Sequence, residues 1–331
     1  MTDLSTGRIL VTGGAGFIGS AVVWDLNRRG ISNILVSDFL GRDEKWKNLV
    51  ALRFADYLEA DELLARLRSL APLRAIFHLG ACSSTTETDA SYLIRNNFEF
   101  TKTLAHFALE RSIRFVYASS AATYGEAAAE IPETVPLSSL RPLNMYGYSK
   151  HLFDCYAAGA GFLNRLTGLK YFNVFGPNED HKADMRSVVH KAFGEIQKTG
   201  KASLFKSYRP EYSDGGQCRD FLYVKDAVAA TLFLAEQTEG GGLFNVGSGQ
   251  PNTWRTLVES IFGALGCEPD IQFVEMPEYL RPKYQYFTRA KIEKLRAAGF
   301  RDAMTPLPEA VADYVQNYLV PNKHLGDEAS G

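Results

Sequence analysis

The stretch Arg8-Ile-Leu-Val-Thr-Gly-Gly-Ala-Gly-Phe-Ile-Gly19 determines the fold class of this chain. Its first residues form a short apolar run typical of a buried strand, and apolar residues recur at helical spacing from Phe17 onward. Gly13, Gly16 and Gly19 therefore fall in a turn between a strand and a helix. Such glycines permit a tight turn, close approach of a pyrophosphate to the backbone, and close helix–sheet packing. The N–H groups at the helix start would then bind the anion.

Short β-rich runs alternate with helical segments along the next hundred residues. This alternation predicts βαβ units and a parallel sheet. We expect strands over 33–37, 75–79, 115–119 and 169–172, and helices over 59–70, 92–110 and 146–166. The fold class is therefore α/β, with a Rossmann-type doubly wound parallel sheet and a smaller C-terminal α/β substrate domain.

The sequence pattern changes after about residue 173, where the segments between expected helices and strands become longer. We assign 1–172 to a dinucleotide-binding domain, 173–320 mainly to a second domain with some return crossings to the first, and 321–331 to a polar, frayed tail. In the second domain we expect strands near 221, 243–246 and 271–274, and helices over 224–237, 253–265, 290–298 and 306–319. The stretch 205–217 has no periodicity and reads as a surface excursion.

Composition narrows the class of protein. The chain has 331 residues and a formal net charge of −2, from 36 basic and 38 acidic residues, which argues against nucleic-acid or anionic-membrane binding. No apolar run approaches the ~18 residues of a membrane span, and no secretory signal is recognisable, so we expect a cytoplasmic protein. The four cysteines are scattered without CxxC spacing, which favours reduced thiols and no metal centre.

The end of the second expected strand bears on the cofactor. Asp38 stands where an acid accepts hydrogen bonds from ribose hydroxyls, which favours NAD. Arg42 and Lys45 follow closely and could instead hold the 2′-phosphate of NADP. Asp56 could reach the adenine edge or, equally well, cap a helix. The residues alone leave both choices open.

A second group of residues suggests acid–base chemistry. The strand expected at 115–119 runs into Ser120 and Thr123, and Tyr146 and Lys150 follow four residues apart, on one face of a helix. A lysine ammonium beside a phenol is expected to lower the phenol pKa from ~10 toward working pH. A serine or threonine hydroxyl could then bind the substrate oxygen while the tyrosine moves a proton and a hydride passes to or from nicotinamide.

These motifs resemble those of extended short-chain dehydrogenase/reductases that act on nucleotide sugars. More narrowly, the chain is similar to ADP-L-glycero-D-manno-heptose 6-epimerases from about residue 8 to 319. The segments that carry this resemblance are His78–Glu87 (HLGACSSTTE), Ser119–Gly125 (SSAATYG), Asn144–Lys150 (NMYGYSK), Tyr171–Pro177 (YFNVFGP) with His181 and Lys182, Arg219–Phe221 (RDF), and Tyr284–Thr288 (YQYFT).

The resemblance implies inversion of C6″ on an ADP-linked heptose for lipopolysaccharide, through a transient 6″-aldehyde and a tightly held NADP, with NAD possible. It also implies a homo-oligomer, often a pentamer. Because the alcohol oxygen occupies two places during the inversion, the family uses two bases, here Tyr146 and Lys182. From the residues alone, Lys182 would be read as a solvated loop lysine or a phosphate clamp.

The remaining sites follow from the resemblance residue by residue. Ser120 and Lys150 would complete the catalytic set. Cofactor contacts would come from Gly13, Gly16, Phe17, Ile18, Gly19, Asp38, Phe39, Lys45, Asp56, Leu79, Gly80, Ala81, Cys82, Ser83, Asn96, Lys150 and Val174. Substrate contacts would come from Ser120, Asn173, Lys182, Asp184, Phe205, Lys206, Ser207, Tyr208, Arg219 and Tyr284. Arg219 would clamp the pyrophosphate bidentately, while Asn173 and Tyr284 could also be ordinary packing residues at the core edge.

Several positions depart from the family pattern. Phe39 replaces a small polar residue, Ala60 stands where a lysine is expected, and Asp184 stands where a serine is expected and could pair with Arg186. The surface excursion that ends in Ser213–Gly216, just before Arg219, resembles an insertion. A UDP-hexose 4-epimerase would fit Ser120, Tyr146 and Lys150 equally well, and a catalytically silent dinucleotide sensor is a third hypothesis. A 4,6-dehydratase would need an acid pair that 119–125 lacks.

Overall fold

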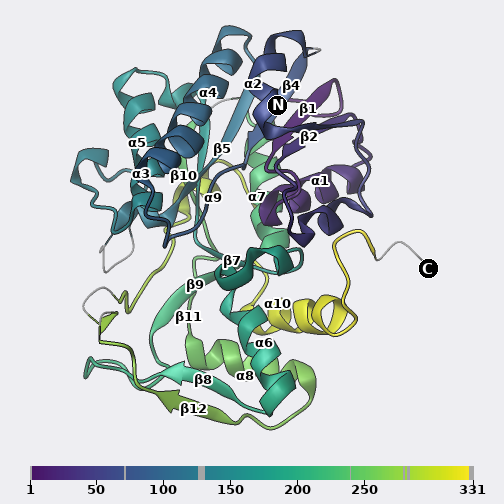
Figure 1. The fold of residues 1–331 in the computed structure, drawn as a ribbon. Coiled ribbons are helices and arrows are strands. Elements are labelled where there is room, and N and C mark those ends of the chain that lie inside the picture. Colours follow the sequence, from purple (N-terminus) through teal and green to yellow (C-terminus); the bar gives the residue numbers. More distant parts are fainter. Residues whose placement is uncertain are drawn as a thin grey trace.

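The structure is a computed structural model, and it describes residues 2–70, 72–125, 131–238, 240–278, 280–281 and 284–327. It has a larger lobe built on a parallel sheet and a smaller lobe below it (Figure 1). No helix among the described residues is both long and apolar enough to span a bilayer.

A seven-stranded sheet forms the centre of the larger lobe, and each of its neighbouring pairs is parallel. This confirms the predicted fold class. In spatial order the strands are β10 (Gly242–Val246), β6 (Thr167–Tyr171), β5 (Arg114–Ser120), β4 (Leu73–His78), β1 (Arg8–Thr12), β2 (Ile34–Asp38) and β3 (Asp56–Glu59).

Helices cover both faces of this sheet, because alternate strand side chains point to opposite faces. In β1, Ile9 and Val11 pack into the core shared with α1 (Phe17–Arg28) and α7 (Val224–Glu236), whereas Leu10 packs into the opposite core. That opposite core is formed with α2 (Ala60–Arg66), α4 (Phe100–Glu110) and α5 (Met145–Gly159).

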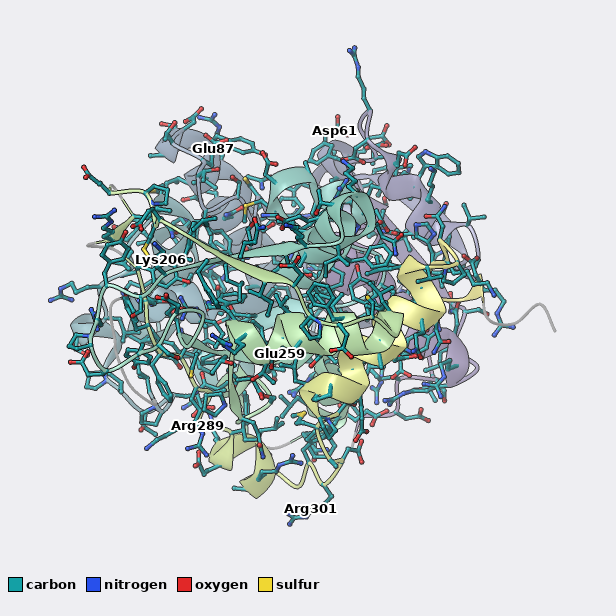
Figure 2. All side chains as sticks on the ribbon, turned by 90° about the horizontal axis from the view of Figure 1, so that it is seen from below. Asp61, Glu87, Lys206, Glu259, Arg289 and Arg301 are labelled. Carbon is teal, nitrogen blue, oxygen red and sulfur yellow. The ribbon has the colours of Figure 1, made fainter. Side chains whose placement is uncertain are left out.

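The smaller lobe carries two short sheets. One contains β7 (Asn173–Phe175), β9 (Cys218–Tyr223) and β11 (Pro251–Thr253), and the other pairs β8 (Ala202–Phe205) with β12 (Ile271–Val274). Its helices are α6 (Val188–Thr199), α8 (Trp254–Leu265) and α10 (Leu307–Tyr314), whereas α9 (Glu293–Ala297) packs against β10 of the large sheet. Figure 2 views this lobe from below, with Glu259 on the exposed side of α8.

The chain crosses between the lobes more than once. After β9 it returns with α7 and β10 to the large sheet before α8 begins in the smaller lobe (Figure 1). The tail does not fray through residue 327, because Leu325 is buried and its N–H donates to Asn178 Oδ1 (2.9 Å). Residues 328–331 lie outside the described part of the chain.

Five helical predictions need correction. The helix expected over 306–319 is α10 only to Tyr314 and continues as a π-helical turn over Val315–Leu319, and the helix expected over 290–298 covers only Glu293–Ala297. The helix expected over 146–166 ends at Gly159, and the helix expected over 59–70 gives way to a 3-10 turn after Arg66. Residues 92–110 form a continuous helical segment from α3 (Ala90–Leu93) to α4, but a π-helical turn spans Ile94–Glu99. Such turns insert an extra residue per turn and are frequent at functional sites.

Candidate active site

The glycine turn has the close contacts that its sequence predicts. Gly13 has φ +67°, and a Cβ on it would lie 2.5 Å from the backbone nitrogen of Gly80. A Cβ on Gly19 would collide with the carbonyl oxygen of Gly13, so α1 can approach β1 this closely only with glycine there. The N-cap of α1 is Gly16, and no side chain caps the helix. The first-turn N–H groups are therefore available to a phosphate, and the turn fits a dinucleotide.

Asp38 serves the glycine turn itself. Its Oδ2 accepts from the N–H groups of Ala15 (2.9 Å) and Gly16 (3.1 Å), and its Oδ1 accepts from Phe39 N–H (2.7 Å) and Lys45 Nζ (3.3 Å). The carboxylate at the end of β2 is thus largely satisfied by the protein and is neutralised by Lys45. The sequence cue for NAD weakens accordingly, because the charge that would repel a 2′-phosphate already has a counterion.

The neighbouring positions are more open. Phe39 is 49 % exposed. Asp56 is exposed at the start of β3, and its Oδ1 accepts from the following Tyr57 N–H, so it does not cap α2, whose N-cap residue is Glu59. The helix-cap interpretation of Asp56 is therefore wrong, while its role toward adenine stays a prediction.

The segment after β4 is fastened to both the glycine turn and α5. Gly80 N–H donates to Thr12 Oγ1 (3.3 Å). Asn97, which sequence reasoning missed, accepts from Cys82 N–H (2.9 Å) and donates to Cys82 O (2.9 Å) and to Ser149 Oγ (3.0 Å). Asn97 lies in the π-helical turn and is buried. A single amide thus connects the predicted cofactor segment Leu79–Ser83 to the helix that carries Tyr146.

Helix α5 presents Tyr146 and Lys150 at the carboxyl end of β5. The side chain of Asn144 caps the helix by accepting from Gly147 N–H (2.8 Å), which fixes where Tyr146 enters the first turn. The Ser120 hydroxyl, at the end of β5, hydrogen-bonds to the phenol of Tyr146. Lys150 is buried one turn further along α5. The structure therefore brings the three predicted catalytic residues of this segment together.

The electrostatics of this group correct one sequence prediction. Burial raises the pKa of Tyr146, and the hydrogen bond from Ser120 only partly opposes it. Burial also lowers the pKa of Lys150 to about 8, although Asp154 acts in the opposite direction. The expected fall in the phenol pKa is therefore wrong for the protein alone, because loss of water disfavours the phenolate more than the neighbours favour it.

A cavity of about 730 Å³ opens beside Tyr146. Five of the predicted site residues line it: Ser120, Tyr146, Asn173, Arg219 and Tyr284. Asn173 is held by a hydrogen bond from its Nδ2 to Asp220 O (3.0 Å), with its surface open to the cavity. Residues that the sequence reasoning did not single out also line it, among them Thr85, Thr86, Leu143, Asn144, Gln285 and Arg289.

Arg219 is a buried cation at one end of this cavity. Its guanidinium donates to the carbonyl oxygens of Cys218 (2.9 Å) and Gln285, and it lies over the rings of Tyr284 (5.3 Å) and Trp254 (5.7 Å). Burial lowers its pKa, and no described carboxylate forms an ion pair with it. An uncompensated buried charge is costly unless a partner is supplied, so this end of the cavity suits an anionic ligand.

Lys182 is not a solvated loop lysine. Its Nζ lies 4.8 Å from the ring centroid of Phe17 in the glycine turn, and burial lowers its pKa. It belongs to the 3-10 helix Asp180–Met185, in which Ala183 has φ +47°, a sparsely populated conformation for a residue with a Cβ. Arg186 Nε donates to Asp180 O (2.7 Å), and no ion pair joins it to the exposed Asp184 within the described residues.

The stretch Phe205–Tyr208 contributes less to the cavity than predicted. The Phe205 ring lies 6.4 Å from that of Tyr284, but Lys206, labelled in Figure 2, and the exposed Tyr208 both bind the exposed Glu275. Ser207 N–H is taken by Asp214 Oδ1 (2.7 Å). None of these four residues lines the cavity.

Comparisons with known proteins agree on one family. The model of the NAD dependent epimerase/dehydratase family matches residues 9–247. A relative from Nitratidesulfovibrio vulgaris (strain DP4), named ADP-L-glycero-D-manno-heptose-6-epimerase, is 48 % identical over 314 residues, covering 94 % of this chain and 97 % of the relative.

Two solved structures have the same overall fold. The Helicobacter pylori ADP-L-glycero-D-manno-heptose-6-epimerase is 26 % identical with a TM-score of 0.81, covering 96 % of this chain and 98 % of that one. The Thermus thermophilus UDP-glucose 4-epimerase, solved in complex with NAD, is 27 % identical with a TM-score of 0.73, covering 93 % of this chain and 99 % of that one.

Proposed function

This chain belongs to the NAD dependent epimerase/dehydratase family, and on that premise we propose that it is an ADP-L-glycero-D-manno-heptose-6-epimerase. It converts ADP-D-glycero-β-D-manno-heptose to the L-glycero epimer by inverting C6″, and so supplies heptose for lipopolysaccharide. The proposal rests on the relatives for the identity of the sugar and on the cavity for the class of ligand.

One observation carries the ligand class. A single cavity contains an acid–base pair, Ser120 and Tyr146, together with the guanidinium of Arg219, which forms no ion pair with a carboxylate of the described residues. A guanidinium in this state favours a pyrophosphate, which it can bind through two parallel hydrogen bonds. A nucleotide diphosphate sugar presents both required groups, a pyrophosphate and a secondary alcohol, in one molecule.

The glycine turn and its neighbours would hold the cofactor. The uncapped first turn of α1 would take the pyrophosphate, and the Asp38–Lys45 pair would face the adenosine ribose. We propose NADP, because Lys45 neutralises Asp38 and leaves Arg42 as a second cation nearby. When bound, NADP would supply the hydride acceptor and donor for C6″ and, in its oxidised form, a positive charge that favours the Tyr146 phenolate. Because C6″ is bonded to both C5″ and C7″, the oxidised sugar would be a 6″-ketone and not the 6″-aldehyde expected from the resemblance.

Two bases would serve the two positions of the alcohol oxygen. Tyr146 on α5, steadied by Ser120, would exchange a proton with one epimer, and Lys182, from the 3-10 helix after β7, would exchange a proton with the other. Both are half-buried, and loss of water moves the pKa of Tyr146 upward and that of Lys182 downward. A lowered lysine pKa brings that group closer to the range in which it can act as a base.

The test is epimerisation without added reductant. Purified protein is incubated with either ADP-heptose epimer, and the two products are separated by chromatography, with UDP-glucose as the control substrate. Interconversion of the ADP-heptoses supports the proposal, while turnover of UDP-glucose alone would assign the chain to a 4-epimerase instead.

A second measurement concerns the finer proposals on cofactor and assembly. Mass spectrometry of the small molecules retained through purification should find mainly NADP, and finding only NAD would overturn that choice. We also propose, from the resemblance, a cytoplasmic homo-oligomer such as a pentamer. Light scattering of the purified protein should then give a mass several times that of one chain, and a monomer mass would overturn it.

A further inference from the structure

A third residue extends the catalytic face of α5. Tyr146, Lys150 and Asp154 are spaced four residues apart and so share one face of the helix. Asp154 is completely buried. Its Oδ1 accepts from Tyr117 OH (2.8 Å), and its Oδ2 accepts from Ser119 Oγ (2.8 Å) and Lys170 Nζ (2.9 Å).

Lys170 on β6 completes a buried ion pair and reaches the catalytic strand end. Its Nζ also donates to Thr123 Oγ1 (2.5 Å), and the Thr123 hydroxyl donates to Ser120 O (2.8 Å). The ion pair therefore holds this strand end in two ways. Asp154 accepts a hydrogen bond from Ser119, and Lys170 acts on the backbone carbonyl of Ser120 through the Thr123 hydroxyl. Ser120 in turn hydrogen-bonds to Tyr146.

A buried ion pair of this kind is a poor way to gain stability. Removing both charges from water costs several kcal/mol per ion, and well-packed apolar replacements are often neutral or stabilising. Removing one partner alone is strongly destabilising, because the other charge stays buried. The fold therefore does not require the pair, and its place beside Ser120 and Lys150 calls for another explanation.

We propose that Asp154 and Lys170 form a positioning unit of the active site, which fixes Ser120 against Tyr146 and places a buried carboxylate one helical turn from Lys150. The inference rests on the proposed function and adds to it two residues that act through others. The titratable groups around Lys150 are Tyr146 and Asp154 on its own helix, Cys82 after β4, and His78 on β4.

Among these neighbours, Asp154 is the one carboxylate within the described chain, and it raises the pKa of Lys150 against the effect of burial. His78 has a pKa of about 3, so it is neutral at working pH. The groups facing Asp154 are Lys170 and Tyr117, with His151 and Cys155 further along α5. Loss of Asp154 should therefore lower the pKa of Lys150.

The test compares Asp154→Asn with the double variant Asp154→Asn/Lys170→Met. The single variant leaves Lys170 charged and buried and should unfold at lower urea concentration, whereas the double variant should recover most of that loss. In the double variant kcat should still fall about tenfold or more, because acid–base groups contribute 10²–10⁴-fold when well placed. In a plot of kcat against pH, the fall of kcat at high pH should occur at lower pH in the double variant than in the wild type, because Lys150 loses its proton more easily.

A matched control makes the same two substitutions, Asp to Asn and Lys to Met, in an ion pair away from the cavity. Lys225 and Asp313 form a half-buried pair (2.8 Å) that joins α7 to α10, and the double variant Asp313→Asn/Lys225→Met should leave the fall of kcat at the same pH as in the wild type. If Asp154→Asn/Lys170→Met loses stability but keeps the wild-type pH profile and kcat, the pair is only structural and the proposal is overturned.

A substrate-free readout separates this proposal from the proposed function. The unfolding free energy of the cofactor-free protein should rise with pH through the pKa of Lys150, and that rise should begin at lower pH in the double variant. Failure of the wild type to turn over ADP-heptose would overturn the proposed function alone. If the rise in unfolding free energy begins at the same pH in the double variant and in the wild type, the positioning unit is overturned, whatever the substrate is.

Discussion

Replacing Lys150 by methionine should stabilise the cofactor-free protein at neutral pH while it removes activity. Lys150 is buried, and burial lowers its pKa from 10.5 to about 8. At 1.36 kcal/mol per pH unit, that difference corresponds to about 3 kcal/mol of unfavourable burial of the ammonium. Methionine is unbranched and of similar length, and it removes the charge without leaving a large cavity.

The sign follows from the protons bound in each state. The unfolded chain binds a proton at Lys150 up to pH 10.5, but the folded protein releases it near pH 8, so stability rises with pH between these values. The penalty is fully present below about pH 8 and disappears near pH 10.5. The advantage of Lys150→Met should therefore be about 3 kcal/mol at pH 7 and should shrink toward zero at pH 10.5.

Urea unfolding of both proteins at a series of pH values measures this difference. Lys170→Met is the matched control with the opposite sign. It replaces an equally buried lysine but leaves Asp154 unpaired, so it should lose about 3–5 kcal/mol at pH 7. A Lys150→Met variant that is less stable than the wild type at pH 7, or whose advantage does not change with pH, would refute the reasoning.

The remaining predictions concern the site and its supports. Tyr146→Phe and Lys182→Met should each lower kcat about 10²–10⁴-fold in the ADP-heptose assay without loss of bound cofactor, and full activity of the Lys182 variant would dismiss the two-base scheme. Arg219→Met should raise KM for the nucleotide sugar about 10–100-fold with a smaller change in kcat, since a charged hydrogen bond contributes about 1.5–3 kcal/mol. Arg219→Lys should restore little of this loss, because lysine cannot form two parallel hydrogen bonds, and an unchanged KM would refute the proposed binding of the pyrophosphate by Arg219. Asn97→Ala should lower the unfolding free energy by about 2–5 kcal/mol, because the N–H and C=O of Cys82 lose their partner, and a urea midpoint equal to that of the wild type would contradict this.

The large sheet was predictable because its strands are short, apolar and separated by turn signals. The strand expected at 115–119 is Arg114–Ser120 in the structure, and the strand expected at 243–246 is Gly242–Val246. Helix α6 was missed although its signals were present, since Ser187 caps its start and Gly200 ends it with φ +74°. The helix expected over 146–166 was too long, because apolar periodicity continues past Gly159 while the backbone turns there.

The candidate site was predictable where spacing along one element places the residues. Tyr146 and Lys150 are four apart on α5, and Ser120 ends the strand beside them. Spacing could also have included Asp154, which continues the same face, but nothing local identifies its partner Lys170 on β6. Nor does composition reveal Asn97, whose function depends on a π-helical turn.

The error on Tyr146 shows why such chemistry cannot be read from neighbours alone. Spacing correctly placed a lysine near the phenol, but the pKa depends on how much water both groups lose, which is a property of the packed site. Burial moves both groups toward their neutral forms, so the protein alone holds a protonated phenol next to a lysine that titrates near pH 8. The phenolate needs a further positive charge, which an oxidised nicotinamide cofactor would supply.

The near-zero net charge of the chain conceals an imbalance at the site. Of the cations that the sequence placed there, Lys45 is paired with Asp38 and Lys206 with Glu275. Lys150 and Arg219 are buried and Lys182 is half-buried, none of them has an ion pair to a described carboxylate, and loss of water lowers the pKa of each. Buried cations without counterions reduce stability, and proteins keep such costs at functional sites. Phosphate groups of a cofactor and of a nucleotide sugar are the counterions that would offset this cost, so the same side chains that weaken the empty protein favour its ligands.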